Sequence, residues 1–151
     1  MSEKNQEIIL LPDEWATKKL GQKLANELTL NSVLLLSGNL GAGKTTLIQG
    51  LGEALGIKEA IVSPTFTLIN EYLEGKIPLY HIDLYRLKSE QIKDLYLENY
   101  WQGIEVEEGI TAIEWSELLP KFPSNYIKIK LEIDEKLGRK ATIFRQINSS
   151  E

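Results

Sequence analysis

The stretch "SVLLLSGNLGAGKTTLIQGL" at residues 32–51 decides the fold. Its opening residues, 32–37, form an apolar run typical of a strand that is buried on both faces. Residues 38–45 then match the phosphate-loop pattern G-x-x-x-x-G-K-[ST]. Residues 44–56 predict a helix that ends at a glycine. A buried strand, a glycine-rich loop and a helix in this order predict an α/β domain with a phosphate site.

The residue types of this loop suit a phosphate chain. Glycines let the backbone wrap closely, so that successive N–H groups and the helix N-terminus face phosphate oxygens. Lys44 supplies a positive charge for the β and γ phosphates, and the Thr45 hydroxyl is placed to ligate Mg²⁺. ATP is favoured because the guanine-binding pattern N-K-x-D is absent. The predicted nucleotide contacts of the loop are Leu40, Gly41, Ala42, Gly43, Lys44, Thr45 and Thr46.

Two acidic residues end predicted strands and complete a candidate catalytic site with Lys44. Glu114 closes the apolar run "ITAIE", and Asp83 closes "LYHID". We expect Glu114 to join the Mg²⁺ shell, directly or through water, and Asp83 to orient or deprotonate the attacking water. The sequence leaves these two roles open to exchange. His81, the single histidine, receives no predicted role.

The segment "SPTFT" at residues 63–67 follows the helix of the phosphate loop. Many phosphate-loop proteins carry a segment here that senses the γ-phosphate. Thr65 or Thr67 is then a candidate for contact with the metal or the phosphate. The alternative is a proline-initiated turn into a strand, which the pattern supports about equally.

The remaining pattern predicts a P-loop NTPase-like α/β fold with a mixed sheet, parallel near the loop and antiparallel elsewhere, flanked by helices. We expect one domain over residues 1–147 and a frayed tail over 148–151. The further elements expected are helices at 13–28 and 89–100, two strands within 63–85 joined by a turn at 74–76, and strands at 109–115, 126–133 and 140–147.

Composition limits the partners and the compartment. The chain of 151 residues has a net charge of −5 and no cysteine. Nucleic-acid-binding domains are usually basic, so direct RNA binding is disfavoured, whereas docking on another protein is compatible with an acidic surface. The first residues lack the apolar run of a signal peptide, and no stretch is long enough for a membrane span. We therefore expect a cytoplasmic protein without membrane association.

Four fragments together resemble one family: "SGNLGAGKTTLIQGL", "SPTFTLINEY", "YHIDLYRL" and "AIEWSE" occur in this order in TsaE proteins, also called YjeE. The resemblance runs from about Pro12 to Arg139, and its second and third fragments are specific to the family. Asn39 stands where aspartate is frequent, at a position whose side chain the phosphate cradle does not need.

The resemblance implies a bacterial ATPase that binds ATP and Mg²⁺ and is needed to form N6-threonylcarbamoyladenosine in tRNA. It implies two protein partners, TsaB and TsaD, of which TsaD transfers the threonylcarbamoyl group, so that tRNA is reached only through the complex. By resemblance, Lys44 and Thr45 bind phosphate and Mg²⁺, Glu114 belongs to the metal site and Asp83 to the catalytic site. Further positions near the nucleotide are Glu14, Trp15, Trp115 and Arg139.

Two other function classes remain open from the sequence. A small-molecule or nucleoside kinase would need an acceptor pocket and a lid, and neither is visible in the sequence. A nucleotide-gated binding module would use the two acids for affinity without turnover.

Overall fold

The computed structural model describes residues 6–39, 41–64, 66–136 and 138–147, so the predicted tail at 148–151 lies outside the described residues. The elements in chain order are β1 (Gln6–Leu11), α1 (Glu14–Leu24), β2 (Val33–Ser37), α2 (Lys44–Ala54), β3 (Ile69–Tyr72), β4 (Leu79–Asp83), α3 (Ser89–Lys93), α4 (Glu98–Gln102), β5 (Ile110–Glu114), the 3₁₀ turn η2 (Ser116–Leu118), β6 (Tyr126–Asp134) and β7 (Gly138–Gln146).

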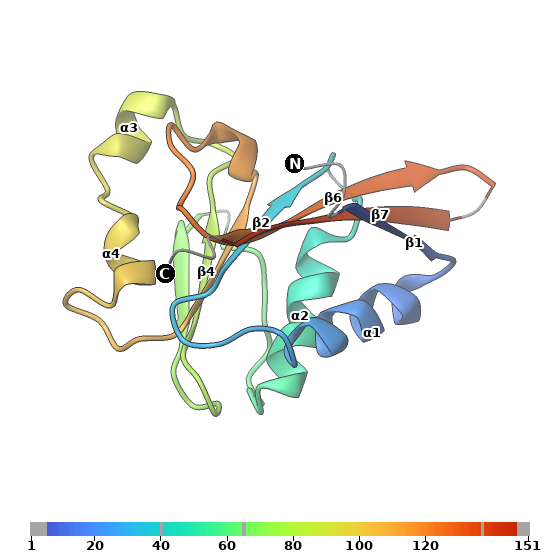
Figure 1. Cartoon of the computed structure of the whole chain (residues 1–151), viewed down its shortest axis with the longest axis horizontal. Helices are drawn as coiled ribbons and strands as arrows, with labels where there is room; N and C mark the ends of the chain where they lie inside the picture. The colour runs from blue at the N-terminus through green and yellow to red at the C-terminus, as the bar shows by residue number, and fades with distance from the viewer. Residues whose placement is uncertain (1–5, 40, 65, 137, 148–151) are drawn as a thin grey trace.

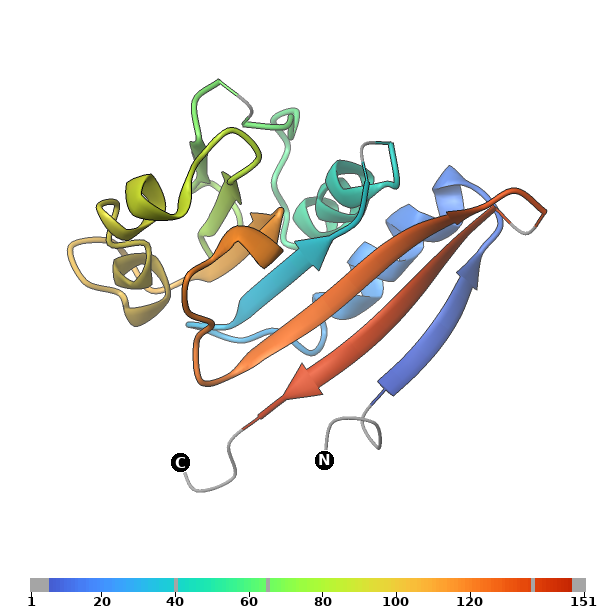
Figure 2. The same cartoon turned by 90° about the horizontal axis from the view of Figure 1, so that it is seen from above.

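The strands form one seven-stranded sheet in the order β1-β7-β6-β2-β5-β4-β3. The four middle strands, β6, β2, β5 and β4, are parallel to one another. Antiparallel strands extend this centre at both ends, with β7 and β1 on one side and β3 on the other. Figures 1 and 2 show the long β6–β7 pair running beyond the parallel centre. The predicted mixed α/β sheet is confirmed.

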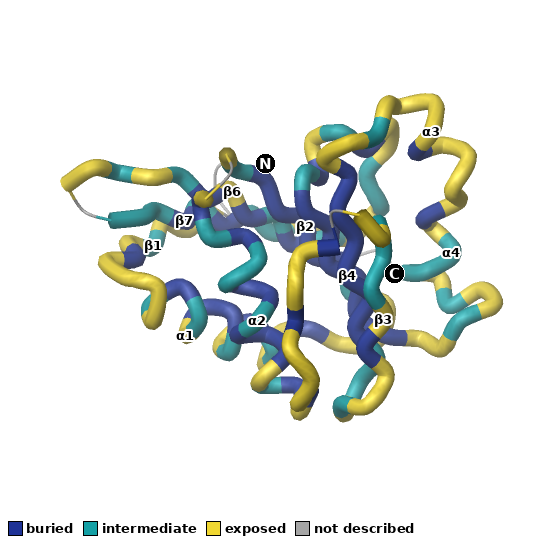
Figure 3. The backbone as a smooth tube through the Cα atoms, turned by 180° about the vertical axis from the view of Figure 1, so that it is seen from behind, coloured by how far each residue is buried: buried dark blue, intermediate teal, exposed yellow. Residues whose placement is uncertain are grey.

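The two faces of β2 pack against different elements. Leu34 and Leu36 point into a hydrophobic cluster shared with α1 and α2. Val33 and Leu35 point the opposite way, into a cluster shared with α3, α4 and η2. Because both faces are covered, the strand carries apolar residues at successive positions instead of alternating. Figure 3 shows β2 and β4 as buried strands, whereas the segment around α3 is largely exposed.

Helices α1 and α2 pack closely because glycines lie at their contact. A Cβ atom at Gly50 would lie 2.0 Å from the backbone oxygen of Lys18, and one at Gly21 would lie 2.0 Å from the oxygen of Leu47. These distances leave no room for a methyl group, so the two backbones approach as closely as glycine permits. This contact holds α2, and with it the phosphate loop, against the sheet.

The first strand was not predicted from the sequence. Residues Gln6–Leu11 pair antiparallel with β7 at the edge of the sheet. Ile8 and Leu10 remain 59% and 52% exposed, so this segment has no fully buried face to produce a strong pattern. Its strand conformation depends on a partner near the other end of the chain.

The prediction of a single helix at 89–100 was wrong, because this segment forms two separate short helices, α3 and α4. Tyr96, between them, has a left-handed backbone with φ of 50°. Ile92 and Leu97 are five positions apart, which on one α-helix would place them about 140° apart. The break allows both side chains to enter the same hydrophobic cluster. Helix α1 also ends earlier than predicted, at Leu24.

In the described part of the chain, no helix has the length and apolarity that crossing a membrane would require. The longest helices, α1 and α2, contain 11 residues each.

Substitution of Gly50 by alanine is expected to lower the free energy of unfolding by about 1–3 kcal/mol, the range for overpacked cores. The added methyl group meets the backbone of α1, which outweighs the roughly 1 kcal/mol by which alanine favours a helix over glycine. Gly52→Ala, on the same helix, is the control, because its Cβ would meet the flexible end of Ile61. Equal midpoints in urea denaturation for both variants would contradict this account.

Candidate functional site

A cleft with a volume of about 730 Å³ opens at the carboxyl ends of β2, β4 and β5, beside the N-terminus of α2. Ligands in open α/β sheets bind at this edge of the strands. The cleft is lined by Glu14, Thr17, Gly41, Gly43, Lys44, Thr45, Thr46, Ser63, Asp83, Tyr85, Arg86, Glu114, Trp115 and Arg139.

The loop between β2 and α2 has the backbone that its glycines allow. Gly38, Gly41 and Gly43 have φ angles of 142°, 81° and 108°. At Gly38 a Cβ would also lie 2.4 Å from the oxygen of Leu131, so this position excludes a side chain for two reasons. The Ala42 N–H, predicted to face phosphate, instead donates to the Asn39 carbonyl within the loop.

The side chain of Lys44 lies across this loop. Its Nζ donates to the carbonyl oxygens of Gly38 at 2.5 Å and Asn39 at 3.0 Å. The same nitrogen is 4.5 Å from the ring centre of Trp115, a cation–π contact. Only 5% of Lys44 is exposed. Burial lowers the pKa of Lys44 from its ordinary value, and the nearby carboxylate of Glu114 acts in the opposite direction.

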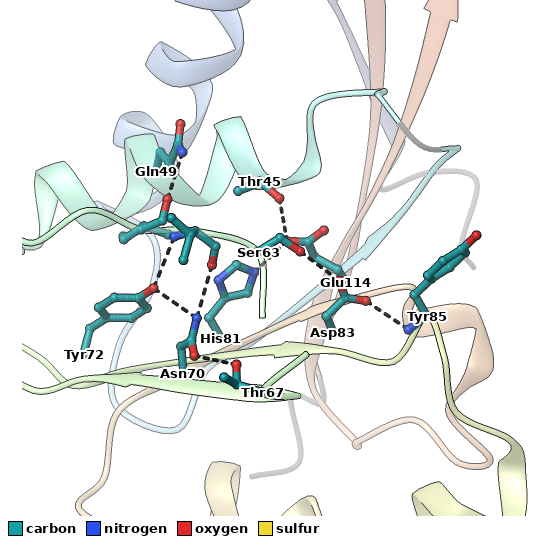
Figure 4. Close-up of polar contacts among 12 residues, drawn as sticks. Thr45, Gln49, Ser63, Thr67, Asn70, Tyr72, His81, Asp83, Tyr85 and Glu114 are labelled. Carbon is teal, nitrogen blue, oxygen red and sulfur yellow. Dashed lines mark hydrogen bonds and ion pairs between the residues drawn. The ribbon is translucent and has the colours of Figure 1, made fainter. Parts of the chain in front are cut away.

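The Glu114 carboxylate is the most enclosed acid of the cleft, with 3% exposure. Its Oε2 atom accepts a hydrogen bond from the Thr45 hydroxyl at 2.9 Å. The same oxygen lies 2.6 Å from Nε2 of His81, which is completely buried (Figure 4). The phosphate-loop helix and strand β4 therefore meet at one carboxylate on β5.

Asp83 lies beside Glu114, because the two are paired residues of the parallel strands β4 and β5. Its Oδ2 accepts from the Ser63 hydroxyl at 3.0 Å, and its Oδ1 accepts from the Tyr85 backbone N–H at 2.9 Å. Both contacts are visible in Figure 4. Asp83 thus connects the segment after α2 to the acidic edge of the sheet.

Trp115 and Arg139 close the cleft from two sides. Trp115 has a left-handed φ of 59°, and its ring packs against that of Tyr85 at a centroid distance of 4.8 Å. Arg139 donates to the Gly41 carbonyl through Nη2 at 2.9 Å. This bond connects strand β7 to the phosphate loop.

The family model described as "Threonylcarbamoyl adenosine biosynthesis protein TsaE" matches residues 11–141. The chain belongs to the TsaE family. It is 58% identical over 135 residues to the "tRNA threonylcarbamoyladenosine biosynthesis protein TsaE" of Nostoc sp., covering 89% of this chain and 83% of that protein. It is 57% identical to the protein of the same name from Synechocystis sp., covering 82% of this chain and 78% of the relative.

The fold of a TsaE-family chain is also supported by a solved structure. The crystal structure of YdiB from Bacillus subtilis superimposes with a TM-score of 0.81 and 32% identity. The match covers 95% of this chain and 87% of the other. The P-loop NTPase-like fold predicted from the sequence is thereby confirmed.

Most of the described residues predicted for the site line this TsaE-family cleft, and two of them, Trp15 and Ala42, do not. Trp15 is 67% exposed and lies outside the cleft lining, with Lys19 over its ring. Ala42 is 1% exposed and belongs to the hydrophobic core. Leu40 lies outside the described residues, so its predicted contact is not tested.

Among the described residues of the "SPTFT" segment, Ser63 contacts Asp83 and Thr67 does not line the cleft. The Thr67 hydroxyl donates to Asn70 Oδ1 at 2.8 Å and is absent from the cleft lining. Thr65 lies outside the described residues. Ser63 donates to Asp83, and after it the chain turns, with the Leu68 N–H donating to the Pro64 carbonyl at 2.7 Å.

Several residues of the site were not predicted. Thr17 follows Glu14 by one helical turn on the same side of α1, and this spacing could have indicated it. Tyr85 and Arg86 directly follow Asp83 in the sequence and line the same cleft. His81 is a different case, because its contact with Glu114 crosses two strands and leaves no local pattern.

The donor set suits a hard cation such as Mg²⁺. Thr45 offers a hydroxyl oxygen and Glu114 a carboxylate oxygen, and these groups are already 2.9 Å apart. In the described residues no group of three or more His, Cys, Asp and Glu side chains could hold a metal ion by itself. Mg²⁺ commonly takes one or two protein oxygens and completes its shell with phosphate and water, so the residues present fit it.

Replacement of Lys44 by methionine is expected to raise the melting temperature of the ligand-free protein at pH 7 by about 2–4 °C, corresponding to about 1 kcal/mol. The reason is that a buried ammonium with a lowered pKa costs stability while it is charged. Below pH 10.5 the unfolded state binds more protons at this lysine, so the penalty diminishes as pH rises through the lowered pKa toward 10.5. The advantage of the variant should diminish over the same window.

The control for this measurement is Lys18→Met, which removes a partly exposed lysine paired with Glu53 at 2.9 Å. It is expected to change the melting temperature little and downward. Calorimetry that shows Lys44→Met to be less stable than the parent protein would contradict the cost assigned to the buried charge.

Proposed function

We propose that this chain is a Mg²⁺-dependent ATP hydrolase of tRNA threonylcarbamoyladenosine biosynthesis. It acts in the cytoplasm on a complex of TsaB and TsaD, and is not itself the transferase. The observation that carries the hydrolase part is the pair of acids at one edge of the sheet. Asp83 and Glu114 are adjacent across β4 and β5, and Glu114 is hydrogen-bonded to the threonine of the phosphate loop.

The phosphate chain would be held by the loop and by Lys44. The glycines keep the loop backbone open to an anion, and the N-terminus of α2 adds its partial positive charge. Lys44 already has its ammonium at the loop, where two carbonyl oxygens hold it. Exchange of these carbonyls for phosphate oxygens would pair the buried charge with anions. Arg86 and Arg139 also line the cleft and can face a phosphate chain.

The metal site would use Thr45 and Glu114. Bound Mg²⁺ would neutralise charge that develops on the phosphate oxygens during their transfer to water. The hydroxyl of Thr45 would turn from Glu114 toward the metal, and Glu114 would hold the ion directly or through a bound water.

Asp83 would act on the attacking water. Its two oxygens accept from Ser63 and from the Tyr85 N–H, so the orientation of the carboxylate is fixed before any substrate binds. Each oxygen of this carboxylate can still accept a further hydrogen bond. Asp83 can therefore accept a proton from a water molecule and orient the lone pair of that water toward a phosphorus atom. Ser63 also makes this acid sensitive to the position of the segment after α2.

The hydrolase proposal predicts phosphate release from ATP and Mg²⁺ in buffer alone, since a kinase would wait for an acceptor. Asp83→Asn is expected to retain nucleotide affinity and lose most of the turnover, by about 10²-fold or more. Glu114→Gln is expected to need a higher Mg²⁺ concentration for the same nucleotide affinity. Titration calorimetry and a phosphate assay measure both effects.

Two results would contradict these roles. Identical Mg²⁺ dependence in both variants with hydrolysis intact would refute them. Nucleotide binding without any phosphate release in the parent protein, alone or with partners, would support the binding module instead.

The partner part of the proposal concerns the surface next to the cleft. Phe66 is 89% exposed, and Arg86, which lines the cleft, lies over its ring at 5.1 Å. An exposed aromatic residue connected to the nucleotide cleft is a suitable contact for another protein. A change in phosphate number would reach it through Arg86 and through the bond between Ser63 and Asp83.

We therefore expect slow turnover alone and faster turnover with TsaB and TsaD together, with partner binding that differs between ATP and ADP. Such a difference is required, because a ligand with equal affinity for two states shifts neither. Phe66→Ala should preserve turnover alone and reduce stimulation by the pair. Leu30→Ala, which truncates a 51% exposed leucine before β2, is the matched control. Stimulation that is equal in both variants would remove Phe66 from the partner surface.

A further inference from the structure

His81 is a completely buried histidine on β4, the strand next to the β3 edge of the sheet. It lies on β4, two residues before Asp83, and its Nε2 is 2.6 Å from Glu114 Oε2. A histidine that only fills a core position could be replaced by an aliphatic residue. The short contact with a carboxylate of the proposed metal site gives it a more specific role.

The register of the sheet explains how the contact arises. Across β4 and β5, His81 is opposite Ala112, and Asp83 is opposite Glu114. His81 and Glu114 are therefore diagonal neighbours on the face that also carries α2. The side chain of Ala112 is only a methyl group, which leaves room for the imidazole to reach the carboxylate. Figure 4 shows His81 and Glu114 side by side.

The chemistry of the two partners identifies Nε2 of His81 as the hydrogen-bond donor. Nδ1 of His81 is buried and has no hydrogen-bond partner among the described residues. A carboxylate accepts hydrogen bonds, so Nε2 carries the proton that faces Glu114. Nε2 is therefore the donor of the hydrogen bond to Glu114.

We infer that His81 is a positioning residue that fixes the Glu114 carboxylate for Mg²⁺. This inference rests on the proposed role of Glu114 at the metal. Thr45 and His81 both donate to Oε2, from α2 and β4, and neither bond uses Oε1. When the Thr45 hydroxyl turns away to ligate a metal, the His81 bond remains and keeps the carboxylate in its rotamer. Partners of this kind typically contribute 10–100-fold to metal affinity.

The test measures ADP affinity as a function of Mg²⁺ in purified full-length protein. His81→Leu removes the donor at similar volume and should raise the Mg²⁺ concentration for half-maximal affinity by about 10-fold or more. Affinity in EDTA, without Mg²⁺, should stay unchanged. His81→Gln places an amide N–H where Nε2 was and should recover most of the loss. Thr111→Val is the control, since its hydroxyl is a second buried group without a described partner.

A second measurement uses the ligand-free protein. The sequence contains one histidine, so its ¹⁵N imidazole signals belong to His81 without assignment. They should show a proton on Nε2. A bare Nε2 would overturn the inference, whether or not the leucine variant folds, because the ring would then have no hydrogen to donate to Glu114.

Comparison with Glu114→Gln separates this inference from the proposed function. If Glu114→Gln changes the Mg²⁺ dependence but His81→Leu does not, the positioning role is wrong and the metal site stands. If Glu114→Gln leaves Mg²⁺ dependence unchanged, both ideas are wrong. The double variant should lose no more than Glu114→Gln alone, because the histidine acts only through the carboxylate.

Discussion

The buried carboxylate of Glu114 is the constraint on which the arrangement of the cleft depends. With 3% exposure it has lost most of its water, and a desolvated charge is unstable without donors. Thr45 on α2 and His81 on β4 supply them. One side chain on β5 therefore connects the helix of the phosphate loop to the neighbouring strand β4. Displacement of any of the three elements would leave a buried charge without its partners.

These hydrogen bonds require α2 to lie close to the sheet, and that position is set by packing contacts outside the cleft. Gly21 and Gly50 let α1 and α2 touch at backbone distance, and the first hydrophobic cluster holds α2 on the sheet. The site itself carries features that oppose stability. Lys44 is a buried ammonium, and Trp115 has a left-handed backbone that non-glycine residues rarely adopt. Proteins tolerate such local costs where binding requires them, because the remaining core offsets them.

Particular residues show where sequence analysis succeeded and where it did not. Gly38 and Lys44 belong to a motif whose spacing is fixed by one continuous loop, so the strand, loop and helix around it were predictable. The two short helices near Tyr96 were predicted as one, because the break serves a cluster contact and not a local preference. Strand β1 was missed because its pairing partner is β7, almost a chain length away. Of the two threonines considered in residues 63–67, Thr67 lies outside the cleft, and Thr65 is not among the described residues.

By itself the sequence determined the buried strand, the glycine loop and the helix, and with them the fold class and the presence of acids at strand ends. These features depend on local spacing, which backbone geometry converts directly into structure. Only the tertiary structure decided that Ser63 contacts Asp83 and that His81 contacts Glu114. Both contacts depend on the register between β4 and β5 and on the return of the chain after α2. Register is set by the packing of both sheet faces together, and no short stretch of the sequence contains that information.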